Sequence, residues 1–147
     1  MAITQAVANS FKKELLEGEH KFQFTSGNTF KLALYSSTAT LNSATTAYTT
    51  TNEVPASGQY SAGGGILVKP NPSTSVASGV AIVTFANLSF TGVTITARGA
   101  LIYNTSSSNK AVAVLDFTSD KTATSGTFTI QFPAFTTSAA ILRIGNA

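Results

Sequence analysis

The sequence predicts a mainly β protein, an antiparallel β-sandwich or jelly roll with one N-terminal α-helix. About eight to ten short β-prone segments, separated by polar turns, follow one another along most of the chain. Two apolar runs between Arg98 and Phe117 flank the polar loop Thr-Ser-Ser-Ser-Asn-Lys, which is typical of a hairpin. Charged residues make up only 10% of the 147 residues, against about 25% in typical globular domains. This low charge, together with abundant Thr, Val, Ile and Phe, favours β structure.

The N-terminal segment carries the predicted helix. Apolar side chains recur along one helical face, formed by Val7, Phe11 and Leu15 with Ile3 and Leu16 beside them. Thr4 would cap this helix and Gly18 would end it. We therefore expect a helix or arm over residues 1–18 and a single β-sandwich domain over residues 19–147. The apolar stripe fits two interpretations equally: a helix that covers its own β core, or an arm that docks on a neighbouring subunit.

In the first part of the β region, short predicted strands are separated by long loop-forming stretches. From Thr29 to Tyr35 apolar residues occupy every second position, which predicts a strand. Residues 36–51 are rich in Ser, Thr and Ala, and they favour an extended loop or an irregular edge strand. The run of three glycines at 63–65 predicts a tight turn or a close backbone approach. Residues 66–69 fit a short strand, and Pro70 leads into a Ser-rich loop that extends through Ser78.

The second part of the β region shows clearer strands. We expect them at residues 80–85, 88–90, 93–97, 127–132 and 140–144, with the hairpin of residues 98–117 between the third and the fourth. Turn-forming residues at 119–121 and 125–126 predict a turn between the hairpin and the strand that follows. The apolar runs of the hairpin are nearly unbroken. They indicate strands that are covered on both faces, or on one face with a partner chain on the other.

Few residues offer catalytic or metal-binding chemistry. Cysteine is absent, which excludes thiol catalysis, thiolate metal sites and disulfide scaffolding. His20 is the single histidine, and its position after the predicted helix is typical of a surface residue or of one that complements the helix dipole. The six acids are dispersed and form neither a metal-ligand cluster nor a marked carboxylate pair. We therefore expect no enzyme activity, no metal and no cofactor.

Asp116 is the one acid that interrupts an apolar strand. A buried carboxylate needs a partner, and Arg98 lies at the far end of the same predicted hairpin. We interpret Arg98 and Asp116 as a structural or intersubunit ion pair rather than as catalytic groups.

The charge pattern bears on the partner class and the compartment. The nine Lys and Arg residues are scattered, whereas a nucleic-acid binder concentrates them, so we expect no direct nucleic-acid binding. No stretch approaches the roughly 18 apolar residues that span a bilayer, so we expect no membrane association. The N-terminus has no basic region followed by an apolar run, and the sequence therefore predicts assembly in a cytoplasm.

Several segments together carry a resemblance to one family of known proteins. The opening Met-Ala-Ile-Thr-Gln-Ala-Val-Ala-Asn-Ser-Phe-Lys-Lys-Glu-Leu-Leu is similar to the start of small virion structural proteins of tailed bacteriophages. The other similar segments are Thr-Phe-Lys-Leu-Ala-Leu-Tyr at 29–35, Tyr-Thr-Thr-Thr-Asn-Glu-Val at 48–54, Tyr-Ser-Ala-Gly-Gly-Gly at 60–65, Ile-Thr-Ala-Arg-Gly-Ala-Leu-Ile-Tyr-Asn at 95–104 and Asn-Lys-Ala-Val-Ala-Val-Leu-Asp-Phe at 109–117. The resemblance covers most of the chain and includes no catalytic motif.

Within that group the chain most resembles a capsid cement, or decoration, protein. The resemblance implies a protein on the capsid surface of the virion that binds the major capsid protein as a homodimer or homotrimer. Val7, Phe11, Leu15 and the Ser/Thr-rich loops are the interface candidates. The alternative is a tail, head–tail connector or fibre-associated virion protein. A host-surface binding module and a glycan hydrolase are further readings, and they predict a concave site with clustered aromatics and a pocket with convergent carboxylates, respectively.

Overall fold

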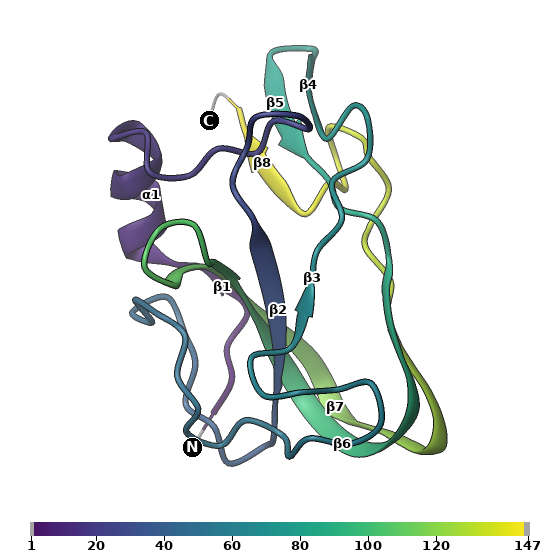
Figure 1. Ribbon diagram of the computed structural model, residues 1–147. Helices are drawn as coiled ribbons and strands as arrows, with labels where there is room; N and C mark the ends of the chain where they lie inside the picture. The colour runs from purple at the N-terminus through teal and green to yellow at the C-terminus, as the bar shows by residue number, and fades with distance from the viewer. Residues whose placement is uncertain (1, 146–147) are drawn as a thin grey trace.

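The computed structural model describes residues 2–145 and confirms a mainly β fold with one short helix near the N-terminus (Figure 1). All strand pairs are antiparallel. They form a larger sheet of order β1-β7-β6-β2-β3 and a smaller sheet of order β4-β5-β8. The elements along the chain are β1 (Ala6–Val7), α1 (Asn9–Leu16), β2 (Phe30–Tyr35), β3 (Gly65–Ile66), β4 (Thr74–Ala77), β5 (Val80–Val83), β6 (Leu88–Asn104), β7 (Lys110–Ile130) and β8 (Leu142–Ile144).

The hairpin predicted over residues 98–117 is the inner half of a much longer one. β6 and β7 pair from Asn104 and Lys110, next to the loop, out to Leu88 and Ile130. The segments expected as separate strands at 88–90 and 93–97 both belong to β6. The turn predicted between residues 119 and 126 is wrong, because β7 continues through it.

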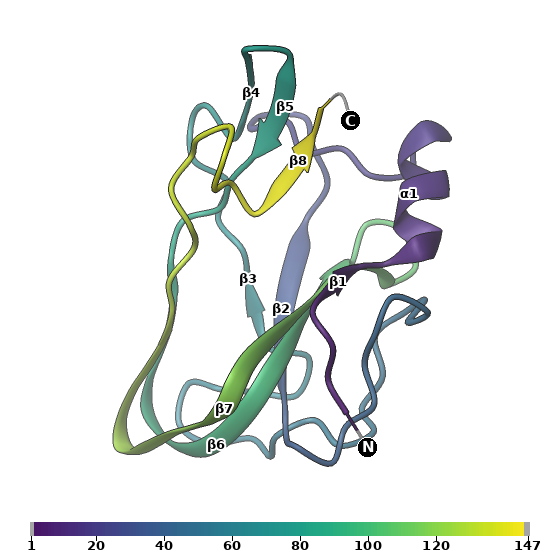
Figure 2. The ribbon, with the colours of Figure 1, turned by 180° about the vertical axis from the view of Figure 1, so that it is seen from behind.

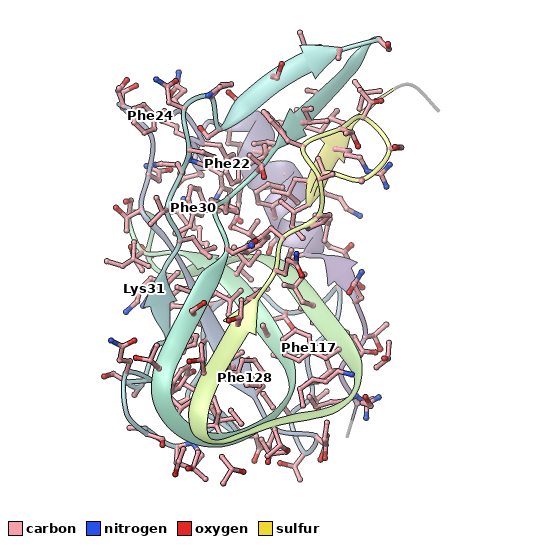
Figure 3. The ribbon with its side chains drawn as sticks, turned by 90° about the vertical axis from the view of Figure 1, so that its right-hand side faces the viewer. Phe22, Phe24, Phe30, Lys31, Phe117 and Phe128 are labelled. Atoms are coloured by element: carbon pink, nitrogen blue, oxygen red, sulfur yellow. The ribbon has the colours of Figure 1, made fainter. Side chains whose placement is uncertain are left out.

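This long hairpin bends back on itself, so that its two halves face each other (Figure 3). Phe117 and Phe128 both lie on β7, and their ring centroids are 6.2 Å apart. In a straight strand, eleven residues would separate them by about 36 Å, at about 3.3 Å per residue. The hairpin therefore supplies both layers of much of the core.

Irregularities in the ladder allow the bend. The pairing register shifts three times between Phe90 and Gly99, and Thr118 and Ser125 adopt positive φ angles of 65° and 45°. Each register shift leaves one or more residues without a partner in the opposite strand. Such extra residues form β-bulges, which bend a strand and increase its twist. The turn-forming residues that predicted a break at 119–126 thus mark bulges inside a continuous strand.

Burial follows the layering of the hairpin. Residues 111–114 of β7 are all buried. Their apolar run is unbroken because other parts of the same chain cover both faces of the strand here. In the outer half, Phe128 and Ile130 are buried, whereas Thr127 and Thr129 are exposed, as the alternation predicted. One contiguous core therefore fills the space between the two halves of the hairpin and β2.

The smaller sheet differs most from the prediction. β4 lies in the stretch that was expected to be a Ser-rich loop, and this expectation is wrong. All four of its residues are exposed, so the sequence shows no inward alternation there. β5 and β8 are shorter than predicted, and the β4–β5 hairpin projects from the end of the molecule (Figure 1).

A close backbone approach at Gly64 fixes the chain before β3. Gly64 has φ +79°, and a Cβ atom there would lie 1.8 Å from the carbonyl oxygen of Leu32 on β2. Gly18, which follows α1, has the same φ of +79° but nothing within 4 Å of the corresponding Cβ position. The two glycines share the backbone constraint and differ in the space around them.

We predict that Gly64→Ala destabilises the protein far more than Gly18→Ala. The positive φ alone costs about 1–2 kcal/mol at either site, whereas the clash at Gly64 raises its loss to at least about 3 kcal/mol. Urea unfolding of the two variants and the wild type measures both losses. Equal losses would contradict the close packing of this segment on β2.

Candidate functional site

Pairing with β7 decides where the helix begins. Ala6 and Val7 form β1 and pair with Val114 and Ala113, and the amide of Ala8 donates to the carbonyl of Val112 at 3.0 Å. The prediction that Val7 lies on the helix is therefore wrong, because the sheet takes up the backbone groups of this segment. The helix begins at Asn9 without a side-chain cap, so the predicted cap at Thr4 is also wrong.

The helix packs on the core of its own chain. Phe11 is buried, and its ring lies 4.8 Å from that of His20 and 6.0 Å from that of Phe22, measured between centroids. Gly18 follows the helix with positive φ, in the position predicted for the stop. Leu16 points away from this core and is 90% exposed. The helix thus covers one end of the β core and leaves an apolar side chain free beside it.

A groove separates this N-terminal segment from the smaller sheet. Figure 2 shows α1 beside that sheet, with β8 as the nearest strand. The N-terminal wall is formed by Val7, Phe11, Leu15 and Leu16. The opposite wall is formed by Ala81, Val83, Leu142 and Ile144. The groove has a volume of ≈ 470 Å³, and apolar side chains make up most of its lining.

All three interface candidates from the sequence therefore line one groove, although only two of them lie on the helix. Phe11 contributes to its buried floor, whereas Val7 and Leu15 are half-buried. Leu16 and Ile144, the large exposed apolar side chains of the groove, were not among the interface candidates from the sequence. The sequence analysis placed Leu16 beside the apolar stripe of the predicted helix, but no sequence pattern indicated that β8 lies opposite it.

The expectation that His20 lies on the surface is wrong. Its side chain is fully buried beside Phe11 and Phe30. The side-chain amide of Asn104 donates to His20 Nδ1 at 3.0 Å, and this leaves Nε2–H to donate to Glu14 Oε1 at 3.1 Å. These bonds fasten the end of α1 to the end of β6.

A second set of polar contacts reinforces the same junction. Lys110 lies 3.3 Å from the Glu19 carboxylate and 3.9 Å from that of Glu14. Ser107 donates to the Glu19 carboxylate at 2.5 Å, and this bond, with Lys110, lowers the pKa of Glu19. The β6–β7 loop and the segment after α1 are therefore joined by charge and by hydrogen bonds.

Glu53 forms a third polar centre, beside the C-terminal end of β2, where it bridges to Tyr35. Its carboxylate accepts hydrogen bonds from the hydroxyls of Tyr48 and Tyr60 and from the amide of Gly63, at 2.6, 2.7 and 2.6 Å. The rings of Tyr48 and Tyr103 stack at 4.7 Å. These contacts order loop 36–64 within the isolated chain, and no feature of the sequence grouped the tyrosines.

The structure brings Arg98 and Asp116 together. Arg98 Nε donates to Asp116 Oδ1 at 3.2 Å, with both side chains partly exposed. The same Oδ1 accepts from the amide of Thr118, at the bulge in β7. The pair therefore lies where the β6–β7 pairing register shifts, between Ala97 and Gly99. Exposed ion pairs contribute only about 0–1 kcal/mol to the free energy of unfolding. We therefore interpret the main effect of the Arg98–Asp116 pair as fixing the geometry of the bulge.

Within residues 2–145, no group of three His, Cys, Asp or Glu side chains is placed to hold a metal ion. The helical structure in that range includes no segment with the length and hydropathy of a membrane span. No protein-family model, curated protein or solved structure matches the chain.

We predict that the tyrosines of the folded protein ionise only at unusually high pH. Burial and the nearby Glu53 carboxylate raise the pKa of Tyr103 to about 12, and burial raises the pKa values of Tyr35, Tyr48 and Tyr60 further. Tyrosines of an unfolded chain ionise at about pH 10. The stability held by the neutral hydroxyls is thus complete below that pH and is lost as the pH rises through the folded pKa values.

Ultraviolet absorbance of tyrosinate, recorded against pH for the folded and the urea-unfolded chain, measures this difference. The folded chain should titrate later and should lose stability progressively above about pH 10. Coincident titration curves would contradict the burial of the tyrosine network.

Proposed function

We propose that this protein is a bacteriophage capsid cement protein, a structural rather than an enzymatic component of the virion. In this role it binds the outer surface of the shell as a homodimer or homotrimer. There it stabilises contacts between major capsid protein subunits after assembly in the host cytoplasm. The resemblance of its segments to small virion proteins motivates the proposal.

The groove between α1 and the smaller sheet is the observation that carries this proposal furthest. It collects the three interface candidates and leaves Leu16 and Ile144 90% and 59% exposed. An exposed apolar surface of this kind, rimmed by polar residues, is typical of a protein-binding site. Charged residues make up only 10% of the chain. Because surface charge opposes association between molecules, little electrostatic repulsion protects this apolar patch from contact with a neighbour.

The helical wall of the groove is fastened to the core of its own chain, which supports the same role. Asn104, His20 and Glu14 join the end of α1 to the end of β6, and a wall that is already held in place loses less conformational entropy on binding. A standard protein interface buries about 1,600 Å² in total. Many copies on one shell would add their binding free energies to the stability of the shell. When the binding sites of one oligomer are linked, the overall affinity also rises without any new contact at each site.

A copy count tests the assignment. Quantitative mass spectrometry of the purified particle, referenced to the major capsid protein, should find this chain in numbers comparable to that protein. A handful of copies would overturn the cement assignment in favour of the tail, head–tail or fibre alternative. Absence from the particle would overturn both.

We predict that Leu16→Asp weakens binding to the shell without unfolding the protein. Leu16 is 90% exposed, so the folded chain tolerates the charge, whereas an interface that buries this leucine loses about 1.5–3 kcal/mol. Co-sedimentation with shells prepared without the protein measures the affinity. Val68→Asp is the matched control, because Val68 is 61% exposed and lies outside the groove. Equal losses for the two variants would contradict the assignment of the groove as the contact surface.

A further inference from the structure

Two cations line the rim of the apolar groove, and no carboxylate in the described part of the chain forms an ion pair with either. Lys12 lies on α1 and Arg143 on β8, and both contribute to the lining. Among residues 2–145, the ion pairs involve Lys13, His20, Arg98 and Lys110, and neither rim cation takes part in one. Arg143 donates to the carbonyls of Thr137 and Ser138, which hold its side chain in place, and no carboxylate within residues 2–145 forms an ion pair with it.

The groove is also bordered by an open strand edge. β8 pairs with β5 along one edge, and no other strand among the described residues pairs with its second edge. An unpaired edge presents backbone donors and acceptors to an incoming extended chain. Apolar walls, two cations and an open edge thus meet at one place.

We propose that the groove binds an extended segment of another protein chain, with apolar side chains at its centre and carboxylates at its ends. The apolar side chains would fill the space between Phe11 and Leu142. The carboxylates would pair with Lys12 and Arg143. The backbone of the segment would add to the edge of β8 as a further strand. Under the proposed function, on which the identity of the partner rests, this segment belongs to the shell protein.

The acids of this chain argue against a second copy as the occupant. Five of the six already have partners within the fold: Glu14 with His20 and Lys110, Glu17 with Lys13, Glu19 with Lys110, Glu53 with two tyrosines, and Asp116 with Arg98. Of the acidic side chains within residues 2–145, Asp120 alone takes part in no such contact. One carboxylate cannot satisfy both rim cations, so charge complementarity favours a different, acidic chain.

Nuclear magnetic resonance of the isolated protein tests the ligand chemistry directly. The probe is the peptide acetyl-Asp-Leu-Thr-Val-Asp-amide, and the comparison is acetyl-Lys-Leu-Thr-Val-Lys-amide. The acidic peptide should shift amide signals of α1 and β8 and should bind at least tenfold more tightly than the basic peptide. Equal binding of the two peptides, shifts elsewhere on the surface, or no shifts at millimolar peptide would overturn the proposal.

Charge reversal identifies the groups responsible. The double variant Lys12→Glu with Arg143→Glu should lose the preference for the acidic peptide at least tenfold. The double variant Lys21→Glu with Lys121→Glu makes the same change in net charge away from the groove and should bind as the wild type does. Equal losses in both would show that net charge, and not the rim, governs binding, and would overturn the proposal.

The shell-binding assay separates this inference from the proposed function. A protein that is abundant in the virion, but whose Lys12→Glu, Arg143→Glu variant binds shells normally, would retain the cement function and overturn the groove inference. A protein that is absent from the virion, but whose groove discriminates the two peptides, would retain the inference and overturn the function.

Discussion

The β6–β7 hairpin bends back on itself, and the larger sheet is built on it. Every other strand of the larger sheet joins it directly or through one neighbour: β1 on β7, β2 on β6, and β3 on β2. The outer ends of the hairpin lead into β5 on one side and toward β8 on the other. Because the hairpin folds back, its outer ends lead to strands that lie near α1, the helix that follows β1. The groove therefore exists because one long ladder brings both of its walls to the same place.

Buried polar centres, rather than regular structure, order the rest of the chain. Asn104 joins the hairpin end to His20 and, through it, to the helix. Glu53 gathers two tyrosine hydroxyls and a backbone amide into the loop beside β2. Buried polar groups are costly when they are unpaired, so each satisfied network selects one arrangement of its loop. This explains how a long Ser/Thr-rich stretch takes one conformation with almost no strand of its own.

The sequence predicted what depends on local pattern and failed where tertiary pairing decides. Alternation at Phe128 and Ile130, and the unbroken run at 111–114, indicated the correct strands because burial imposes those periods. Val7 carries a helical spacing, but its backbone groups are taken by β7. His20 has no pattern that distinguishes a buried ring from an exposed one. The exposed strand β4 has no inward face to generate a signal. The groove combines residues from both ends of the chain, and no local pattern could pair Leu16 with Ile144.

Under the proposed cement function, cryo-electron microscopy of the purified virion would show both where the protein lies and which face it uses. We expect this fold in many copies on the outer shell, with α1 and β8 turned toward the capsid protein and an extended segment of that protein in the groove between them. A groove that faces solvent on a shell-bound protein, or a protein found on the tail, would contradict this expectation.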